Sequence, residues 1–154
     1  MPTRIRHERS SCPVARSMDV LGDKWTLLII GAALTGTTRP MDFSRQLPGL
    51  ARTILSARRQ RLVALGVFEI TPVSETSLYH EYVITEMGNR LLPVVTALRQ
   101  WSADYLFDPS EPRQCLVDRR TGIPVAPVQV NSAHGEPITP NDAQIALCNP
   151  ARTL

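Results

Sequence analysis

The stretch MDFSRQLPGLARTILSARRQRLVALG, residues 41–66, decides the fold. It predicts a short helix over residues 41–47 and a longer helix over residues 50–65, with Pro48 and Gly49 between them. Proline disfavours helix in the residue before it, and glycine permits the backbone angle needed to leave one helix and begin another. A short helix, a tight turn and a long helix are the parts of a helix-turn-helix, which places its second helix in the major groove of DNA.

The longer helix has an apolar face and a polar, basic face. Leu55 and Leu62 stand seven residues apart and therefore share one face. The remaining surface carries side chains suited to phosphates and base edges, namely Arg52, Thr53, Ser56, Arg58, Arg59, Gln60 and Arg61. This pattern alone fits two interpretations, a helix that reads DNA and an amphipathic hairpin with a solvated basic face.

The composition limits the class of protein. A chain of 154 residues with 43% hydrophobic residues suffices for one domain with a packed core and an appendage. A net charge of +3 permits a nucleic-acid partner without requiring one. The longest apolar run, LLIIGAALTG, is too short to span a bilayer, and three cysteines without a CxxC spacing indicate a reduced protein. We therefore expect a cytoplasmic protein with no membrane partner, which would be nucleoid-associated if the basic helix reads DNA.

Two helices are expected before the decisive stretch, after a flexible arm of residues 1–11. Cys12 and Pro13 open the first helix, because proline is well accommodated at a first helical position. Apolar residues then follow at i, i+4 and i+7, namely Val14, Met18 and Leu21. Asp23 is expected to cap a second helix over residues 24–34, which is apolar nearly all round and therefore buried at the centre of the domain.

A β-hairpin is expected after Gly66. Residues 67–71 are rich in β-branched and aromatic side chains, residues 72–77 form a polar turn, and residues 78–84 alternate as a returning strand. A hairpin directly after a helix-turn-helix is the wing of a winged-helix domain. Because an isolated hairpin is marginally stable, we expect it to pack on the helices.

The last helix is expected to begin after Thr85 and to carry an apolar stripe as far as Leu106. Pro93 lies either in its first turns or at a kink. The stripe is either a core face or, together with the first helix, a homodimer interface. We favour the dimer, because operators are usually palindromic and a two-fold symmetric protein matches them. The expected interface residues are Val14, Met18, Leu92, Val95, Leu98, Trp101 and Tyr105.

The composition changes again near Asp108. Residues 108–114 suggest a linker and residues 115–130 suggest short strands, so we expect residues 109–154 to form a β-rich C-terminal extension. The predicted fold is thus mainly α with a small β-hairpin wing (α+β). It comprises the arm, a winged helix-turn-helix domain of residues 12–108 and the extension.

Several segments between residues 12 and 101 carry a resemblance to a known family. They read CPV (12–14), GDKWTLLII (22–30), PGL (48–50), EYVITEMG (81–88) and LPV (92–94), and they occur in the family's order. The chain resembles the HxlR branch of the MarR-like winged-helix transcriptional regulators. The resemblance implies a homodimeric regulator, with repression favoured over activation, that places the helix of residues 50–65 in the major groove of operator DNA. The alternative is a winged helix that pairs with other proteins and does not read DNA.

The resemblance also implies which residues contact DNA. The outward face of the recognition helix offers Arg52, Thr53, Ser56 and Gln60 to base edges. Arg39 and Arg45 are expected to contact the DNA backbone. Ile70 and Tyr79 stand where the family has wing arginines, so His80 is the remaining wing candidate.

Two departures from the family pattern concern packing. Arg39 is followed by Pro40 where relatives have phenylalanine, so Phe43 is expected to supply the missing aromatic packing. Arg59 stands at the place of a leucine. We expect it to extend to the surface or to pair with Asp42 or Glu69.

Cys12 matches a cysteine that some relatives use to sense electrophiles or oxidants. The alternative is a small buried residue beside the dimer interface. The extension resembles a tail that binds zinc in longer relatives, but residues 121–122 and 131–135 lack the thiols, and His134 alone is more typical of a surface residue. We expect no metal and no cofactor.

No enzyme motif is present in the sequence. It contains no glycine-rich phosphate loop, no HExxH and no GxSxG, and no pair of carboxylates at a useful spacing. The expected partners are double-stranded operator DNA, a second copy of the chain and a small-molecule effector.

Overall fold

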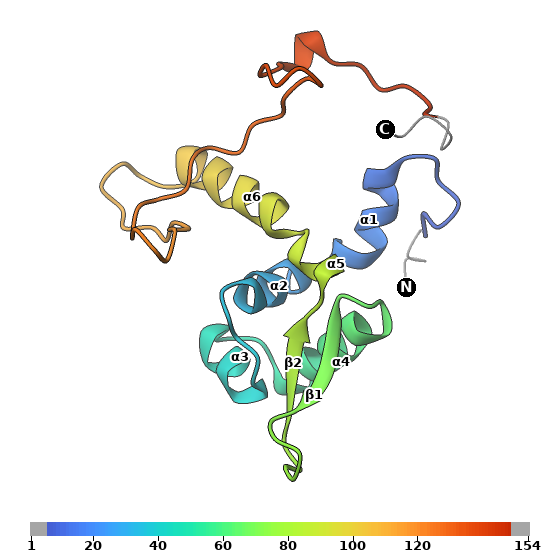
Figure 1. Cartoon of the computed structure of the whole chain (residues 1–154), viewed down its shortest axis with the longest axis vertical. Coiled ribbons are helices and arrows are strands. Elements are labelled where there is room, and N and C mark those ends of the chain that lie inside the picture. The colour runs from blue at the N-terminus through green and yellow to red at the C-terminus, as the bar shows by residue number, and fades with distance from the viewer. Residues whose placement is uncertain (1–5, 149–154) are drawn as a thin grey trace. The chain divides into compact units, whose positions relative to one another are not determined.

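The computed structural model describes residues 6–148 (Figure 1). The chain divides into two compact units, Met1–Val95 and Thr96–Leu154, and each is described here by itself. A compact unit need not fold independently, so the domain boundaries after residues 11 and 108 stay predictions. Within residues 6–148, no helix has both the length and the apolar character needed to cross a membrane.

In the described part of the N-terminal unit, four helices come first along the chain, and a two-stranded hairpin follows them (Figure 1). The helices are α1 (Pro13–Leu21), α2 (Thr26–Leu34), α3 (Pro40–Gln46) and α4 (Arg52–Ala64). The antiparallel strands β1 (Phe68–Pro72) and β2 (His80–Ile84) follow, with Ile70 opposite Tyr82. The hairpin extends past α3 and α4, and its tip is the lowest point of Figure 1. The prediction of a mainly helical, winged helix-turn-helix fold is confirmed.

The turn between α3 and α4 has the chemistry that the sequence indicates. Gly49 adopts a φ of 87°, a region in which side chains with a Cβ are strained. Ala51 remains extended, with a ψ of 137°, and is the N-cap of α4. Helix α4 therefore begins at Arg52, two residues later than predicted.

The core of the N-terminal unit lies around α2. Ile29 and Ile30 from α2, Phe43 from α3 and Leu55 from α4 are all at most 1% exposed. The ring of Phe43 lies 6.3 Å from the ring of Phe68 at the start of β1. The prediction that Phe43 supplies aromatic packing is confirmed, and this contact ties the short helix to the wing.

The N-cap position of α2 is Trp25, two residues after the predicted Asp23, but the Asp23 carboxylate still binds the first backbone N–H groups of the helix. This carboxylate accepts hydrogen bonds from the backbone N–H groups of Trp25 at 3.0 Å and Thr26 at 3.1 Å, and from the Thr26 hydroxyl at 2.5 Å. It also pairs with the Arg58 guanidinium at 3.2 Å. Partial burial alone raises the pKa of Asp23, but these hydrogen bonds and the Arg58 charge outweigh it and hold the pKa below its ordinary 3.8.

Replacing Asp23 with asparagine is expected to lower the free energy of unfolding at neutral pH by about 1 kcal/mol. Asparagine keeps one acceptor oxygen for the Trp25 and Thr26 N–H groups, so the change removes the charge and the oxygen that faces the Thr26 hydroxyl and Arg58. Because the folded-state pKa is depressed, the contribution is present above pH 3.8 and is lost as the pH falls through the folded-state value. Urea unfolding of the parent and the variant at about pH 7 and about pH 3 measures the difference in their free energies of unfolding. An equal difference at both pH values would contradict a charge effect.

The last helix of the prediction is two helices, α5 (Glu86–Asn89) and α6 (Leu92–Tyr105). Thr85 caps α5, because its hydroxyl accepts from the Gly88 N–H at 3.2 Å. Pro93 lies in the first turn of α6, where its missing N–H costs nothing, so the first of the two predicted alternatives is confirmed. Gly88 packs so closely that a Cβ there would collide with the Val67 carbonyl and the Ile84 side chain.

The C-terminal unit contains the remaining turns of α6 and the extension. The prediction of a β-rich extension is wrong for its described part. Residues 109–148 contain two isolated bridges, Val117 to Pro124 and Asn131 to Pro137, and a short 3-10 helix, Pro140–Asp142. Six prolines occur in this segment. Proline has no N–H to donate, so pairing stops after a single bridge in each case.

Candidate nucleic-acid interface

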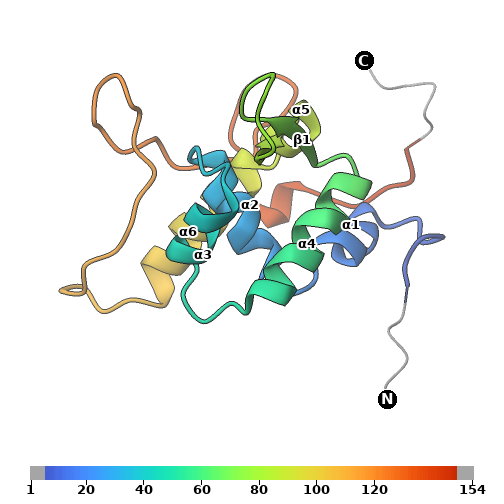
Figure 2. The ribbon, with the colours of Figure 1, turned by 90° about the horizontal axis from the view of Figure 1, so that it is seen from below.

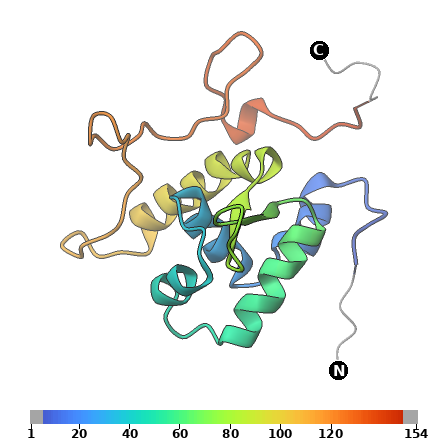
Figure 3. The same cartoon turned by 60° about the horizontal axis from the view of Figure 1, so that its bottom comes forward.

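The exposed face of α4 contains the residues expected to read DNA. Leu55 and Leu62 hold the helix to the core, and the opposite face exposes Thr53 and Gln60, with Ser56 partly exposed at its edge. Ala57 lies between them and is exposed, although the sequence interpretation omitted it. Ala57 follows Thr53 by four residues, and residues at that spacing share one face of a helix, so the sequence could have identified it. Figure 3 shows α4 beside α3, and Figure 2 shows it along the near side of the view.

The arginines of α4 have different surroundings. Arg58 is paired with Asp23, and the Arg61 guanidinium donates to the backbone carbonyl of Asp19 in α1. Arg52 is exposed at the first position of the helix and has no ion pair among the described residues. It is therefore the arginine of this helix whose guanidinium remains available to an external anion.

Arg59 is the clearest departure from expectation. It is 7% exposed, and neither its Nε nor its Nη1 has a hydrogen-bond partner in the described chain. The guanidinium lies 4.4 Å from the centroid of the Tyr82 ring and 5.9 Å from that of Phe43. Burial lowers the pKa of Arg59 below its ordinary range, and Tyr82 opposes that shift. The prediction that Arg59 reaches the surface or pairs with an acid is wrong, because a cation–π stack takes the place of the ion pair.

The backbone-contact candidates already have partners within the chain. The Arg39 Nε lies 3.0 Å from a carboxylate oxygen of Glu81 on β2. Arg45 pairs with Asp42 one turn earlier at 3.2 Å. His80 is exposed at the start of β2. Both arginines are largely exposed, so a phosphate can compete with these carboxylates.

Replacing Glu81 with glutamine is expected to raise the affinity for duplex DNA by about two- to fivefold, because it releases Arg39 for phosphate contact. The matched control is Glu86→Gln, which removes the same charge from the exposed pair with Arg90 on α5. Fluorescence anisotropy at several salt concentrations compares them. An equal gain in both variants would assign the effect to net charge and not to Arg39.

The wing is short of positive charge, as expected. Ile70 and Tyr79 are 46% and 80% exposed, and Glu75 lies in the turn. The hairpin is nevertheless fixed to the helices, since the Tyr82 N–H donates to the Thr38 carbonyl before α3 at 2.9 Å. The wing is therefore fixed beside α4, but it carries few positively charged side chains that could bind phosphate.

Cys12 is exposed at the N-cap of α1 and forms no disulfide, so within a single chain it is not a buried residue. The adjoining segment is held to the helix, because the His7 N–H donates to Asp19 and Arg16 donates to the Ser10 carbonyl. Residues 1–5 of the predicted arm lie outside the described residues. Among residues 6–148, no group of three or more histidine, cysteine or acidic side chains could hold a metal ion.

The residues expected at a dimer interface are mostly exposed. Val14 on α1 is 67% exposed, and Met18 on the same helix is also exposed. On α6, exposed apolar residues follow at i, i+4, i+7 and i+11, namely Val94, Leu98, Trp101 and Tyr105. Leu92 is exposed beside this stripe. Val95 lies in the core at 9% exposure, so Val94 takes its place on the exposed face.

Comparison with known proteins identifies sequence relatives. The pattern of the family described as HxlR-like helix-turn-helix matches residues 20–110. A protein of Mycobacterium tuberculosis described as an uncharacterized HTH-type transcriptional regulator is 35% identical over 135 residues. The aligned region covers 88% of this chain and 85% of that protein.

Solved structures show the same similarity. The crystal structure of PA1607, a candidate transcription factor, superposes with a TM-score of 0.85 and 42% identity, over 91% of this chain and 97% of that chain. The redox regulator HypR in its reduced form superposes with a TM-score of 0.56 and 27% identity, over 60% of this chain and 92% of HypR.

Proposed function

The chain belongs to the HxlR family of helix-turn-helix transcriptional regulators, and from this premise we propose that it is a homodimeric, sequence-specific repressor that binds operator DNA through α4. The family consists of transcriptional regulators and not of enzymes, and its helix-turn-helix implies DNA binding. The observation that carries the proposal is Arg52, exposed and without an ion pair in the described chain, at the start of a helix whose polar face is open.

In the proposed complex, α4 enters the major groove, and most of its base contacts come from its N-terminal half. Arg52 donates to a guanine edge, and Gln60 contacts an adenine edge. Thr53 and Ser56 offer hydroxyls, and the methyl group of Ala57 allows close approach to the groove floor. Arg39 and Arg45 exchange their carboxylate partners for phosphates, and His80 is the wing contact.

The proposed dimer uses two exposed apolar faces, one on α1 and one on α6, and each face is described by itself. Val14 and Met18 contribute on α1, and Leu92, Val94, Leu98, Trp101 and Tyr105 contribute on α6. Aromatic residues on an exposed helix face are typical of association surfaces. Sedimentation velocity across protein concentrations tests this proposal, since a monomer at every concentration would contradict it.

DNA binding is tested with DNA from upstream of the protein's own gene. A DNA-reading regulator is expected to bind it with an affinity that falls steeply with salt, because released counterions drive the association. Footprinting then locates the operator. A winged-helix module that pairs with proteins instead would give no footprint and no salt-dependent shift.

Cys12 is proposed as a sensor of electrophiles or oxidants. Its exposure at the start of α1 supports this role, as does the similarity to a redox regulator. The protein would accordingly act in the reducing cytoplasm, on the nucleoid. Treatment with an electrophile is expected to release DNA from the parent protein and not from the Cys12→Ser variant. An equal response of the two proteins would contradict the proposal.

A further inference from the structure

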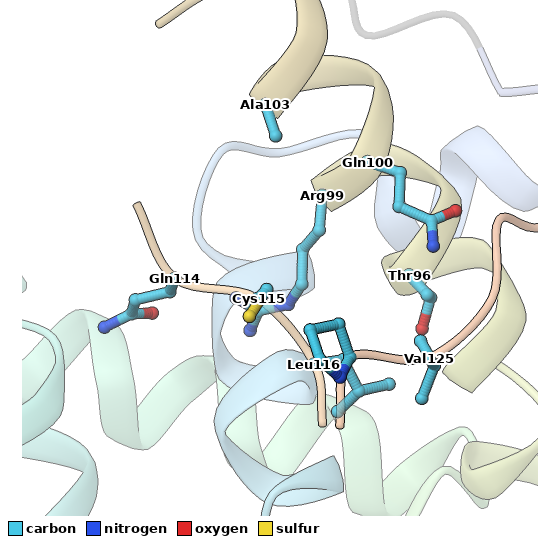
Figure 4. A pocket seen from close by; sticks show the side chains of 9 residues that line it. Thr96, Arg99, Gln100, Ala103, Gln114, Cys115, Leu116 and Val125 are labelled. Carbon is cyan, nitrogen blue, oxygen red and sulfur yellow. The ribbon is translucent and has the colours of Figure 1, made fainter. Parts of the chain in front are cut away.

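The C-terminal unit contains a hollow of about 140 Å³ that the DNA-binding role does not use (Figure 4). Arg99, Gln100 and Ala103 line it from α6. Cys115, Leu116 and Val125 line it from the extension. Every residue of the hollow thus belongs to the one compact unit, and most of the walls on the extension side are aliphatic.

Hydrogen bonds fix the walls of the hollow. The Gln100 Nε2 donates to the Ala126 carbonyl at 3.0 Å, and its Oε1 accepts from the Val128 N–H at 2.8 Å. The Val125 N–H donates to the Leu116 carbonyl at 3.0 Å, which joins the two segments of the extension. A ligand would therefore enter a preformed site, and it would not have to order a loose loop on binding.

Arg99 is the charged group of this site. Figure 4 shows its side chain directed from α6 toward the segment that carries Cys115. It is partly buried, and no ion pair to it exists among residues 6–148. Both ends of the neighbouring Gln100 amide are already engaged with backbone. A partly desolvated guanidinium beside apolar walls favours a carboxylate, which it binds with two parallel hydrogen bonds.

We propose that this hollow binds a small organic acid, with its carboxylate on Arg99 and a compact apolar body against Ala103, Leu116 and Val125. The volume sets the size, since an engineered apolar cavity of roughly 150 Å³ holds one benzene molecule. The binding site is independent of the winged helix. The interpretation of this hollow as the effector site of a regulator rests on the function proposed above.

Cys115 provides a reporter for the test. In a Cys12→Ser, Cys148→Ser background it is the single thiol of the chain, and its alkylation by uncharged iodoacetamide is followed without DNA. Benzoate is expected to slow alkylation in a saturable manner at constant ionic strength. Benzamide, which has the same shape without the charge, and acetate, which has the charge without the body, are expected to have little effect.

Arg99→Gln is expected to raise the benzoate concentration needed for half-maximal protection of Cys115 by about ten- to a hundredfold. Arg113→Gln, which removes the same charge outside the hollow, should leave protection unchanged. Circular dichroism verifies that both variants fold. Failure of benzoate to protect the folded parent, equal protection by benzamide, or unchanged protection in Arg99→Gln would overturn the proposal. Because protection is measured without DNA, a failure of operator binding is a separate result.

Discussion

Replacing Arg52 with alanine is expected to weaken operator binding by about ten- to a hundredfold, the cost of losing one arginine contact to a base edge. The fold should not change, because Arg52 is exposed and has no ion pair within the described chain. Anisotropy titrations against the footprinted operator measure the affinity, and thermal unfolding measures the stability. Specificity should also relax at one base position, which a set of single-base operator variants detects.

The matched control for Arg52 is Arg61→Ala. It removes the same side chain from the same helix, but the Arg61 guanidinium is bound to the Asp19 carbonyl. This control is expected to lower stability slightly and to change operator affinity far less than Arg52→Ala. If Arg52→Ala binds the operator as tightly as the parent protein, the proposed orientation of α4 in the groove is wrong.

Replacing Arg59 with leucine is expected to raise the free energy of unfolding by about 1–3 kcal/mol. The guanidinium is 7% exposed with two nitrogens unpaired, so the folded state bears a desolvation cost that the unfolded state does not. The stack on Tyr82 returns part of that cost, roughly 2 kcal/mol. Leucine fills most of the same space beside Leu55 and Leu62. Urea unfolding at neutral pH compares the two proteins.

Arg58→Leu is the matched control for Arg59, because the two residues are adjacent on α4. Arg58 is paired with Asp23 at 3.2 Å, and the change leaves that carboxylate without its cation. We expect Arg58→Leu to lower stability by up to about 1 kcal/mol. A loss of stability in Arg59→Leu comparable to that in Arg58→Leu would mean that the ring stack outweighs the cost of burying the guanidinium.

The elements of the winged helix could be predicted because local signals specify them. Pro13 and Pro40 each mark the first position of a helix, Asp23 marks the approach to α2, and Gly49 marks a positive φ. The seven-residue spacing of Leu55 and Leu62 then identified which face of α4 is buried. The extension was misjudged by the same reasoning, since its β-branched residues suggested strands while its prolines prevented the pairing.

The DNA-binding candidates were only partly predictable from the sequence. Thr53 and Gln60 are exposed as their spacing indicated, but Ala57 was overlooked because its side chain carries no polar group. On α6, Val95 and Val94 are adjacent valines, and the sequence pattern could not tell which of them faces the core. The answer depends on which of the two valines joins the buried core cluster of the N-terminal unit, which no local signal records.

The sequence by itself determined the helix-turn-helix, the wing and the order of the helices, because backbone preference and hydrophobic period act between residues a few positions apart. Only the tertiary structure decided the role of each arginine. Arg58 and Arg61 are held by Asp23 and Asp19, Arg39 by Glu81, and Arg59 by Tyr82. Charge pairing and desolvation depend on distance and burial in space, and these partners lie more than twenty residues away along the chain. Arg52 stays available to an external anion, because no ion pair to it exists within residues 6–148.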